Sequence, residues 1–280
     1  MVTGVGDGGG TTPAEGRVPQ GVDITRPSIA RVYDYLLGGK DNFTPDREVG
    51  DRIKKALPEV HLGVRAQRMV LGRAIRYMVG EAGIRQLVDI GSGLPTAGNV
   101  HEVARSIAPE TRVIYVDNDP IVLAHARALL AGSSGVAVVD RDLREPERLL
   151  EAPEVRVEID FDRPVGLLLC GIVHYVSDEE DPAGLIARLI AALPSGSHVF
   201  LHHLVEAGTP GEKAAETAMR QGIGRGFFRT PDQVRGFLHG LELVEPGLVR
   251  VPDWRPNGTE DSAEEHPVLR LAVAAVGRKP

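Results

Sequence analysis

QLVDIGSGLPTAGNVH, residues 86–101, combines a short apolar run, a glycine-rich turn and the start of a helical pattern. The run at 87–90 is typical of a buried parallel strand, and Gly91 and Gly93 follow where the backbone must turn. Helical spacing of apolar residues resumes at Val100. Such a unit presents backbone N–H groups at a helix N-terminus, and glycine lets a ligand approach the main chain closely. The stretch therefore predicts a nucleotide-type cofactor site in an α/β fold.

A second unit of the same kind, RVIYVDNDPIVLAHARALL, occupies residues 112–130. Asp117 ends its apolar strand, and Pro120 opens the helix that follows. Because an acid at this point of an open α/β sheet accepts hydrogen bonds from a ribose diol, we predict that role for Asp117. The alternative is that Asp117 is a solvated strand end. Asp119 is interpreted as the N-cap of the helix.

The glycine turn departs from the dinucleotide-binding pattern. That pattern has a small residue three positions after the second glycine, where this chain has Thr96, preceded by Pro95. The departure disfavours NAD. The pattern Asp89-x-Gly91-x-Gly93 instead resembles the first motif of class I S-adenosylmethionine-dependent methyltransferases, although their frequent third glycine is replaced by Pro95.

A third strand is predicted at 136–139 and is followed by Asp142 and Leu143. Ligands of open parallel sheets lie outside the carboxyl ends of the strands. Asp142 is therefore placed to bond an adenine amino group, and the Leu143 amide is placed to bond a ring nitrogen. The alternative is a surface turn in which Asp142 pairs with a neighbouring arginine, such as Arg144.

The most apolar strand, VGLLLCGIV at 165–173, is expected to lie centrally in the sheet. Cys170, Gly171 and His174 then lie at the rim where methyl donor and acceptor meet. His174 is a candidate to accept a proton from the acceptor nucleophile, and the alternative is a hydrogen-bonded structural histidine. The pair His202-His203 is not expected to bind a metal, because adjacent strand residues point to opposite faces.

Amphipathic helices are predicted at the N-terminal side, first from residue 29 to 37 and then at 45–57 and 61–79. The loop 38–43 either closes over a ligand or is an ordinary connection with Phe43 packed inward. The arginines of the third helix are interpreted as its solvated face.

Composition narrows the functional class. The chain has 280 residues, 42% hydrophobic content and a formal charge of −7, which favours small-molecule chemistry over binding to nucleic acid or an anionic membrane. Cys170 is its one cysteine, so no intrachain disulfide can form, and the longest apolar run is too short to cross a bilayer. We expect a cytoplasmic protein with a flexible tail at 1–20, a helical cap at 21–80 and a Rossmann-like domain at 81–280.

The segments ITRPSIARVYDYLLGGKDNF, VDIGSGLPT, VDNDPIVLAHARALL and LELVEPGLV together resemble the S-adenosyl methyltransferase family, a group of class I methyltransferases. The resemblance runs over nearly the whole chain from about Asp23. It implies a Rossmann-like, seven-stranded, mostly parallel sheet with helices on both faces, an antiparallel last strand and an N-terminal helical cap.

The resemblance also implies S-adenosylmethionine as cofactor, and the residues themselves give no reason to expect a metal. Gly91, Ser92 and Gly93 would hold its amino-acid end. The other residues implied are Asp117 for the ribose, Asn118 and Asp142 for the adenine, and Tyr33, Lys40 and Asn42 in the cap.

The leading hypothesis is a methyltransferase that acts on a small-molecule acceptor. A regulatory or scaffold protein that binds S-adenosylmethionine without turnover is the alternative, and a nicotinamide oxidoreductase is a third. An open acceptor cavity favours the enzyme, whereas a crevice filled by Trp254, Phe43 or Tyr175 favours the binder.

Overall fold

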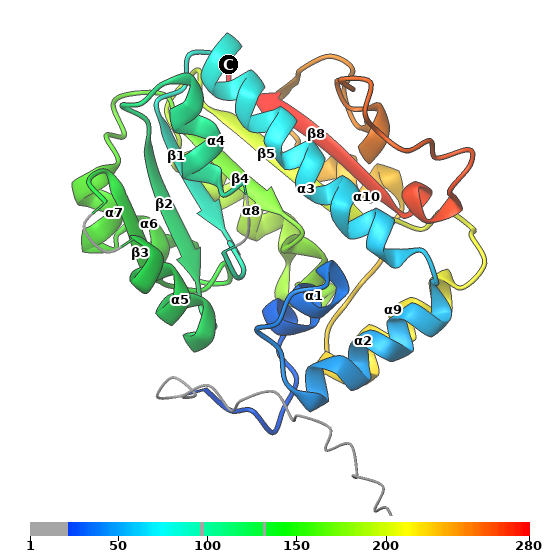
Figure 1. Cartoon of the computed structure of the whole chain (residues 1–280). Coiled ribbons are helices and arrows are strands. Elements are labelled where there is room, and N and C mark those ends of the chain that lie inside the picture. Colours follow the sequence, from blue (N-terminus) through cyan, green and yellow to red (C-terminus); the bar gives the residue numbers. More distant parts are fainter. Residues whose placement is uncertain (1–21, 96–97, 131–132) are drawn as a thin grey trace, which may run out of the picture.

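The computed structural model describes residues 22–95, 98–130 and 133–280, and Figure 1 shows their arrangement. The predicted tail at 1–20 and the position of Thr96 lie outside these ranges. A central sheet runs in the order β3-β2-β1-β4-β5-β8-β6, with β7 also paired to β8. Its strands are β1 (Gln86–Ile90), β2 (Arg112–Asp117), β3 (Val136–Asp140), β4 (Gly166–Cys170), β5 (His198–Leu204), β6 (Glu242–Leu243), β7 (Val249–Arg250) and β8 (Ala272–Arg278).

Strands β1 to β5 are parallel to one another, and β8 runs antiparallel to β5, β6 and β7. This arrangement confirms the predicted α/β fold with an antiparallel last strand. The sheet has eight strands, whereas we expected seven. The predicted strand 241–249 is split: Gly247 N–H bonds Val244 O (2.8 Å) in a turn around Pro246, which has no N–H to give to a ladder.

The chain enters the sheet at β1, continues outward to β3, and returns to β4 on the other side of β1. The point where the order reverses, between β1 and β4, is where open α/β sheets bind their ligands. The register aligns the carboxyl ends of the strands here: Ile90 pairs with Val116, and Asp117 with Asp140. The two signature turns of the sequence are thus brought to one edge of the sheet.

Helices cover both faces of the sheet (Figure 1). On one face, α3 (Val60–Arg76), α4 (Val100–Ile107) and α5 (Pro120–Leu130) pack against alternate side chains of the strands, among them Leu87 and Val113. On the other face, α6 (Pro146–Leu150), α7 (Pro153–Glu158), α8 (Pro182–Ala192) and α10 (Pro231–Gly236) pack against the intervening residues, such as Val88 and Ile114. Helix α3 precedes the expected boundary at residues 80 and 81 and shares a core with the sheet that follows it.

A third apolar cluster joins the N-terminal helices α1 (Ile29–Leu37) and α2 (Thr44–Ala56) to α9 (Glu212–Ile223). Figure 1 shows α2 and α9 side by side. Helix α1 ends at Gly38, whose φ of +83° suits a left-handed cap. Phe43 packs inward beside Ala30 and Ile121, as predicted for an ordinary connection between the two helices.

Short non-α turns complete the described structure: a π turn at Tyr77–Glu81 and 3-10 turns at Val173–Tyr175, Asp178–Glu180, Val251–Asp253 and Pro267–Leu271. Within the described ranges, every helix is too short or too polar to span a membrane.

Candidate functional site

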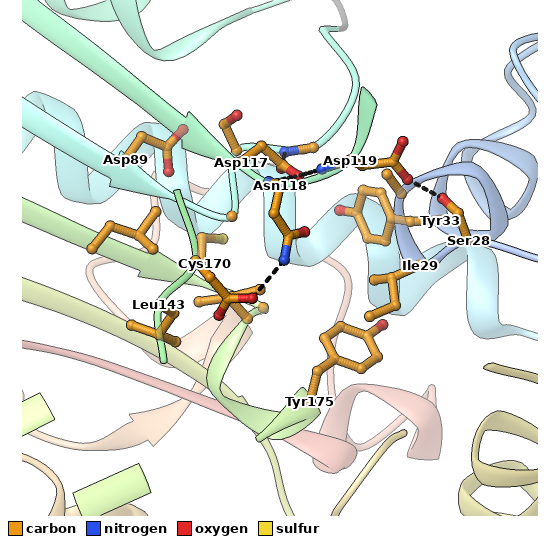
Figure 2. A pocket seen from close by; sticks show the side chains of 18 of the residues that line it. Ser28, Ile29, Tyr33, Asp89, Asp117, Asn118, Asp119, Leu143, Cys170 and Tyr175 are labelled. Carbon is orange, nitrogen blue, oxygen red and sulfur yellow. Dashed lines mark hydrogen bonds between the residues drawn. The ribbon is translucent and has the colours of Figure 1, made fainter. Parts of the chain in front are cut away.

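A cavity of about 480 Å³ lies at the carboxyl ends of β1, β2 and β4, where α1 and α3 face the edge of the sheet (Figure 2). It occupies the reversal point of the strand order. The structure brings nearly all of the predicted cofactor residues together in its wall: Tyr33, Asp89, Gly91, Ser92, Gly93, Asp117, Asn118, Asp142, Leu143, Cys170 and Gly171.

The glycine turn forms one end of the cavity. Gly91 N and Ser92 N both donate to Val116 O, at 2.8 and 3.2 Å, so the turn is pinned to the end of β2. Gly91 and Gly93 have φ values of +72° and +67°, which disfavour other residues. A Cβ on Gly91 would meet Ile172 at 2.6 Å, whereas one on Gly93 would enter open space. The backbone at Gly93 is therefore accessible to a ligand.

Asp117 connects this turn to the turn after β2. Its Oδ2 accepts from Gly93 N at 2.9 Å, and its Oδ1 accepts from Asn118 N (2.9 Å) and Asp119 N (3.0 Å). Burial raises the pKa of Asp117. These three backbone donors hold the carboxylate in one orientation at the cavity wall. Asp119 caps α5 as expected, because its Oδ1 accepts from Ile121 N at 2.9 Å.

Asp89 is a second buried carboxyl at this end, with 4% of its surface exposed. Burial raises its pKa to about 7, the negative charge of Asp117 contributes in the same direction, and Arg68 opposes the shift. An ionised Asp89 would be favoured by a positively charged ligand in the cavity, since opposite charges stabilise one another in a desolvated site.

The wall beyond β2 and β3 contains a polar network. Asn118 Nδ2 donates to Asp142 Oδ2 at 2.7 Å, and Arg144 N and Nε donate to Asp142 Oδ1 at 2.8 and 2.9 Å. The hydrogen bond from the Arg144 guanidinium holds the pKa of Asp142 below its usual range. Asp142 thus combines the two roles that we considered: it lines the cavity and pairs with an arginine.

The end of β4 forms the far wall with α1 and α3. Burial raises the pKa of the Cys170 thiol to about 12, so this side chain is not a thiolate nucleophile at neutral pH. Gly171 has φ +72°, and a Cβ there would meet Gln67 Nε2 at 2.4 Å. Tyr33 lines the cavity while its hydroxyl donates to Val64 O at 3.2 Å.

Two predicted site residues do not reach the cavity. Asn42 Nδ2 donates to Asp34 Oδ2 and Gly39 O, so Asn42 closes the loop after α1 instead. His174 is 3% exposed and packs against the rings of Tyr175 and His203. Burial lowers its pKa well below the usual value, and His174 lies outside the described wall of the cavity, so neither observation favours a catalytic base. The structural alternative expected a hydrogen bond, but the buried Nδ1 of His174 has no partner among the described residues. Lys40 is exposed on the same loop as Asn42.

Several cavity residues were not predicted. Gln67 and Arg68 come from α3, where the helical pattern identifies the apolar face but not the partner of each polar residue. Ser28, the N-cap of α1, donates to Asp119 Oδ2 at 2.5 Å and ties α1 to the start of α5 (Figure 2). Ser28 could have been predicted as an N-cap, because it stands just before a helical pattern. The cavity wall also contains Ile29, Val176, Ile223 and Arg225, for which no site role was predicted.

The strand order, the antiparallel β8 and the cavity at the reversal point define a class I methyltransferase fold. The chain belongs to the S-adenosyl methyltransferase family, whose model matches residues 15–280. S-adenosylmethionine is accordingly its cofactor.

Two solved structures are similar over nearly their full length. A proposed methyltransferase from Thermobifida fusca is 44% identical, with a TM-score of 0.87 and coverage of 94% of this chain and 98% of that one. A DUF574 family protein from Streptomyces avermitilis is 40% identical, with a TM-score of 0.87 and coverage of 92% and 99%. Mitomycin 7-O-methyltransferase is 14% identical, with a TM-score of 0.52 over 92% of this chain and 74% of that one, and shares the fold alone. No curated protein matches the chain.

Proposed function

We propose that this protein transfers the methyl group of S-adenosylmethionine to a nucleophilic atom of a small-molecule acceptor in the cytoplasm. The observation that carries the proposal is the single cavity wall that runs from the glycine turn past Gly171 to Tyr175 and Ile223. Its volume of about 480 Å³ falls in the range of small-molecule sites. The glycine turn, Asp117 and Asp142 line the part of this wall that we assign to the cofactor, and Tyr175 and Ile223 line the part that we assign to the acceptor.

The residues at the cofactor end fit S-adenosylmethionine. The accessible backbone at Gly93 suits its amino-acid end, the fixed carboxylate of Asp117 can accept from ribose hydroxyls, and Asp142 and Leu143 line the cavity beyond β3, where they can contact adenine. The buried Asp89 favours a cationic ligand. When bound, the cofactor supplies an electrophilic methyl group on a sulfonium.

The acceptor end supports catalysis by orientation. Burial raises the pKa of the Cys170 thiol and of the Tyr175 phenol, so neither group is an anionic base at neutral pH. Holding a nucleophile in line with a methyl donor can by itself supply a large part of a rate enhancement. The walls formed by α1, α3 and the end of β4 provide that constraint.

The cavity also favours an enzyme over a binder without turnover. Trp254 is completely buried in the core cluster of α3 and the sheet, and Phe43 packs beside Ala30 and Ile121. Neither residue contributes to the described wall of the cavity, and Tyr175 forms part of that wall. Trp254 and Phe43 therefore leave the space beside the cofactor end free.

Calorimetric titration with S-adenosylhomocysteine and, separately, with NAD tests the proposal. We expect the wild type to bind S-adenosylhomocysteine with micromolar affinity and NAD more weakly. Asp117→Asn should lower the affinity for S-adenosylhomocysteine roughly tenfold or more, because hydrogen bonds to a charged carboxylate are strong. Asp140→Asn is the matched control, since Asp140 is an exposed acid at the end of the neighbouring strand. Absence of S-adenosylhomocysteine binding by the folded wild-type protein would rule the proposal out.

A further inference from the structure

The hydroxyl of Tyr175 has no hydrogen-bond partner among the described residues, although its ring lines the cavity. Figure 2 shows the side chain pointing toward Ile29 of α1 across the cavity. The hydroxyl of Tyr33, in the same wall, is already bonded to Val64 O. Tyr175 is thus the cavity tyrosine whose polar atom is left for a ligand.

The rest of Tyr175 is held without the help of its hydroxyl. Its backbone N–H donates to Ile172 O at 3.0 Å, and its carbonyl oxygen accepts from the Arg225 guanidinium at 3.0 Å. The ring packs on His174 with the centroids 4.4 Å apart. Tyr175 is half-buried and lines the cavity, so this fixed side chain presents an accessible polar atom that a ligand in the cavity can bond.

The surroundings of this hydroxyl restrict the chemistry of that group. Ile29, Ile172 and Val176 contribute apolar wall to the cavity. The one cation next to Tyr175 is neutralised: among the described residues, the Arg225 guanidinium forms a two-point ion pair with Glu180, at 2.6 and 3.0 Å. Burial raises the pKa of Tyr175, so the phenol stays neutral and its oxygen can accept a hydrogen bond but carries no charge. An anionic or cationic group would find no counter-charge from these residues.

We propose that Tyr175 is the acceptor-binding residue and that the acceptor is an uncharged hydroxyl compound with an apolar, ring-sized body. This inference rests on the proposed methyl transfer. The Tyr175 oxygen would accept a hydrogen bond from the acceptor O–H, which would leave a lone pair of the acceptor oxygen free to attack the methyl group. That lone pair forms the new O–C bond while the C–S bond breaks and its electron pair stays on sulfur, and the hydroxyl proton leaves to water.

Ligand-observed NMR on protein saturated with S-adenosylhomocysteine tests the assignment with three matched probes: p-cresol, p-xylene and 4-methylbenzoate. We expect p-cresol to bind best and to bind Tyr175→Phe roughly three- to tenfold more weakly, as one neutral hydrogen bond predicts. We expect p-xylene, which lacks the hydroxyl, to bind both proteins alike. Tyr35→Phe is the control, because the Tyr35 hydroxyl bonds Asp51 on the exposed surface.

Thermal melting separates a ligand contact from a structural one. Tyr175→Phe should melt no lower than the wild type, since none of the residues in the described ranges bonds the lost hydroxyl. Equal binding of p-cresol by Tyr175→Phe and wild type, preference for 4-methylbenzoate, or no binding of any probe beside bound S-adenosylhomocysteine would each overturn the assignment. Failure of S-adenosylhomocysteine itself to bind would instead contradict the proposed function.

Discussion

Asp89 makes the stability of the protein depend on pH through one buried side chain. Its pKa is about 7 in the folded protein, mainly because of burial, against about 4 for an aspartate in an unfolded chain. The folded state therefore binds this proton more tightly, and the contribution of Asp89 to the free energy of unfolding falls as the pH rises from about 4 to about 7. Asp89→Asn should remove that dependence and become progressively more stable relative to wild type over this window.

The measurement is the difference in thermal midpoint between Asp89→Asn and wild type at several pH values. Burial lowers the pKa of His202 to about 4 and that of His203 to about 3, so these residues change stability in the opposite direction. They are present in both proteins and cancel in the difference. Asp162→Asn, at an exposed site, controls for the change of residue type. A difference that stays constant between pH 4 and 8 would contradict the prediction.

At the scale of elements, Glu180 links the two ends of the cavity. Its carboxylate pairs with Arg144, which holds Asp142, and with Arg225, which lies after α9 and also binds the carbonyl of Tyr175. The hydrogen bond from Arg225 is the main cause that lowers the pKa of Glu180 to about 2. Glu180 therefore remains charged and holds the segment after α9 against the cavity at neutral pH.

Glu180→Gln should loosen this segment. We expect hydrogen exchange at the amide of Phe227, which donates to His174 O, to become about two- to fivefold faster, as the loss of a partly exposed ion pair implies. Glu179→Gln is the matched control, because Glu179 is exposed and forms no ion pair within the described structure. Equal exchange in the two variants would show that Glu180 does not hold the segment.

Elements could be predicted where the signal was local. The two strand–turn–helix units, with Asp117 and the glycines, appear at the expected residues because periodicity and glycine act over a few positions. The expected strand 165–173 instead ends at Cys170, because Gly171 adopts φ +72° and residues 173–175 form a 3-10 turn. That turn sends His174 into the interior and Tyr175 into the cavity wall, and an apolar run alone does not reveal it.

At the scale of the whole molecule, contacts between distant segments escaped prediction. Arg73 was interpreted as part of a solvated helix face, yet it is 6% exposed and binds three groups of the C-terminal region. Its guanidinium donates to Val251 O at 2.7 Å, to Trp254 O at 2.8 Å and to Glu260 Oε1 at 2.7 Å. Helical spacing locates an arginine on a helix but does not show which segment of the fold covers it.

Arg73→Met should therefore destabilise the whole protein. The substitution leaves two buried carbonyl oxygens and the Glu260 carboxylate without this donor, and breaking a buried ion pair from one side costs about 3 kcal/mol or more. Arg76→Met, one turn along α3 at an exposed position, should change the free energy of unfolding by no more than about 0.5 kcal/mol. Urea unfolding of both variants measures the difference. Helix α3 packs on the sheet, and Arg73 holds the 251–260 loop. We therefore expect Arg73→Met to unfold in a single transition whose urea midpoint is lower than that of the wild type. A separate early transition with an unchanged main midpoint would mean that Arg73 secures only the loop.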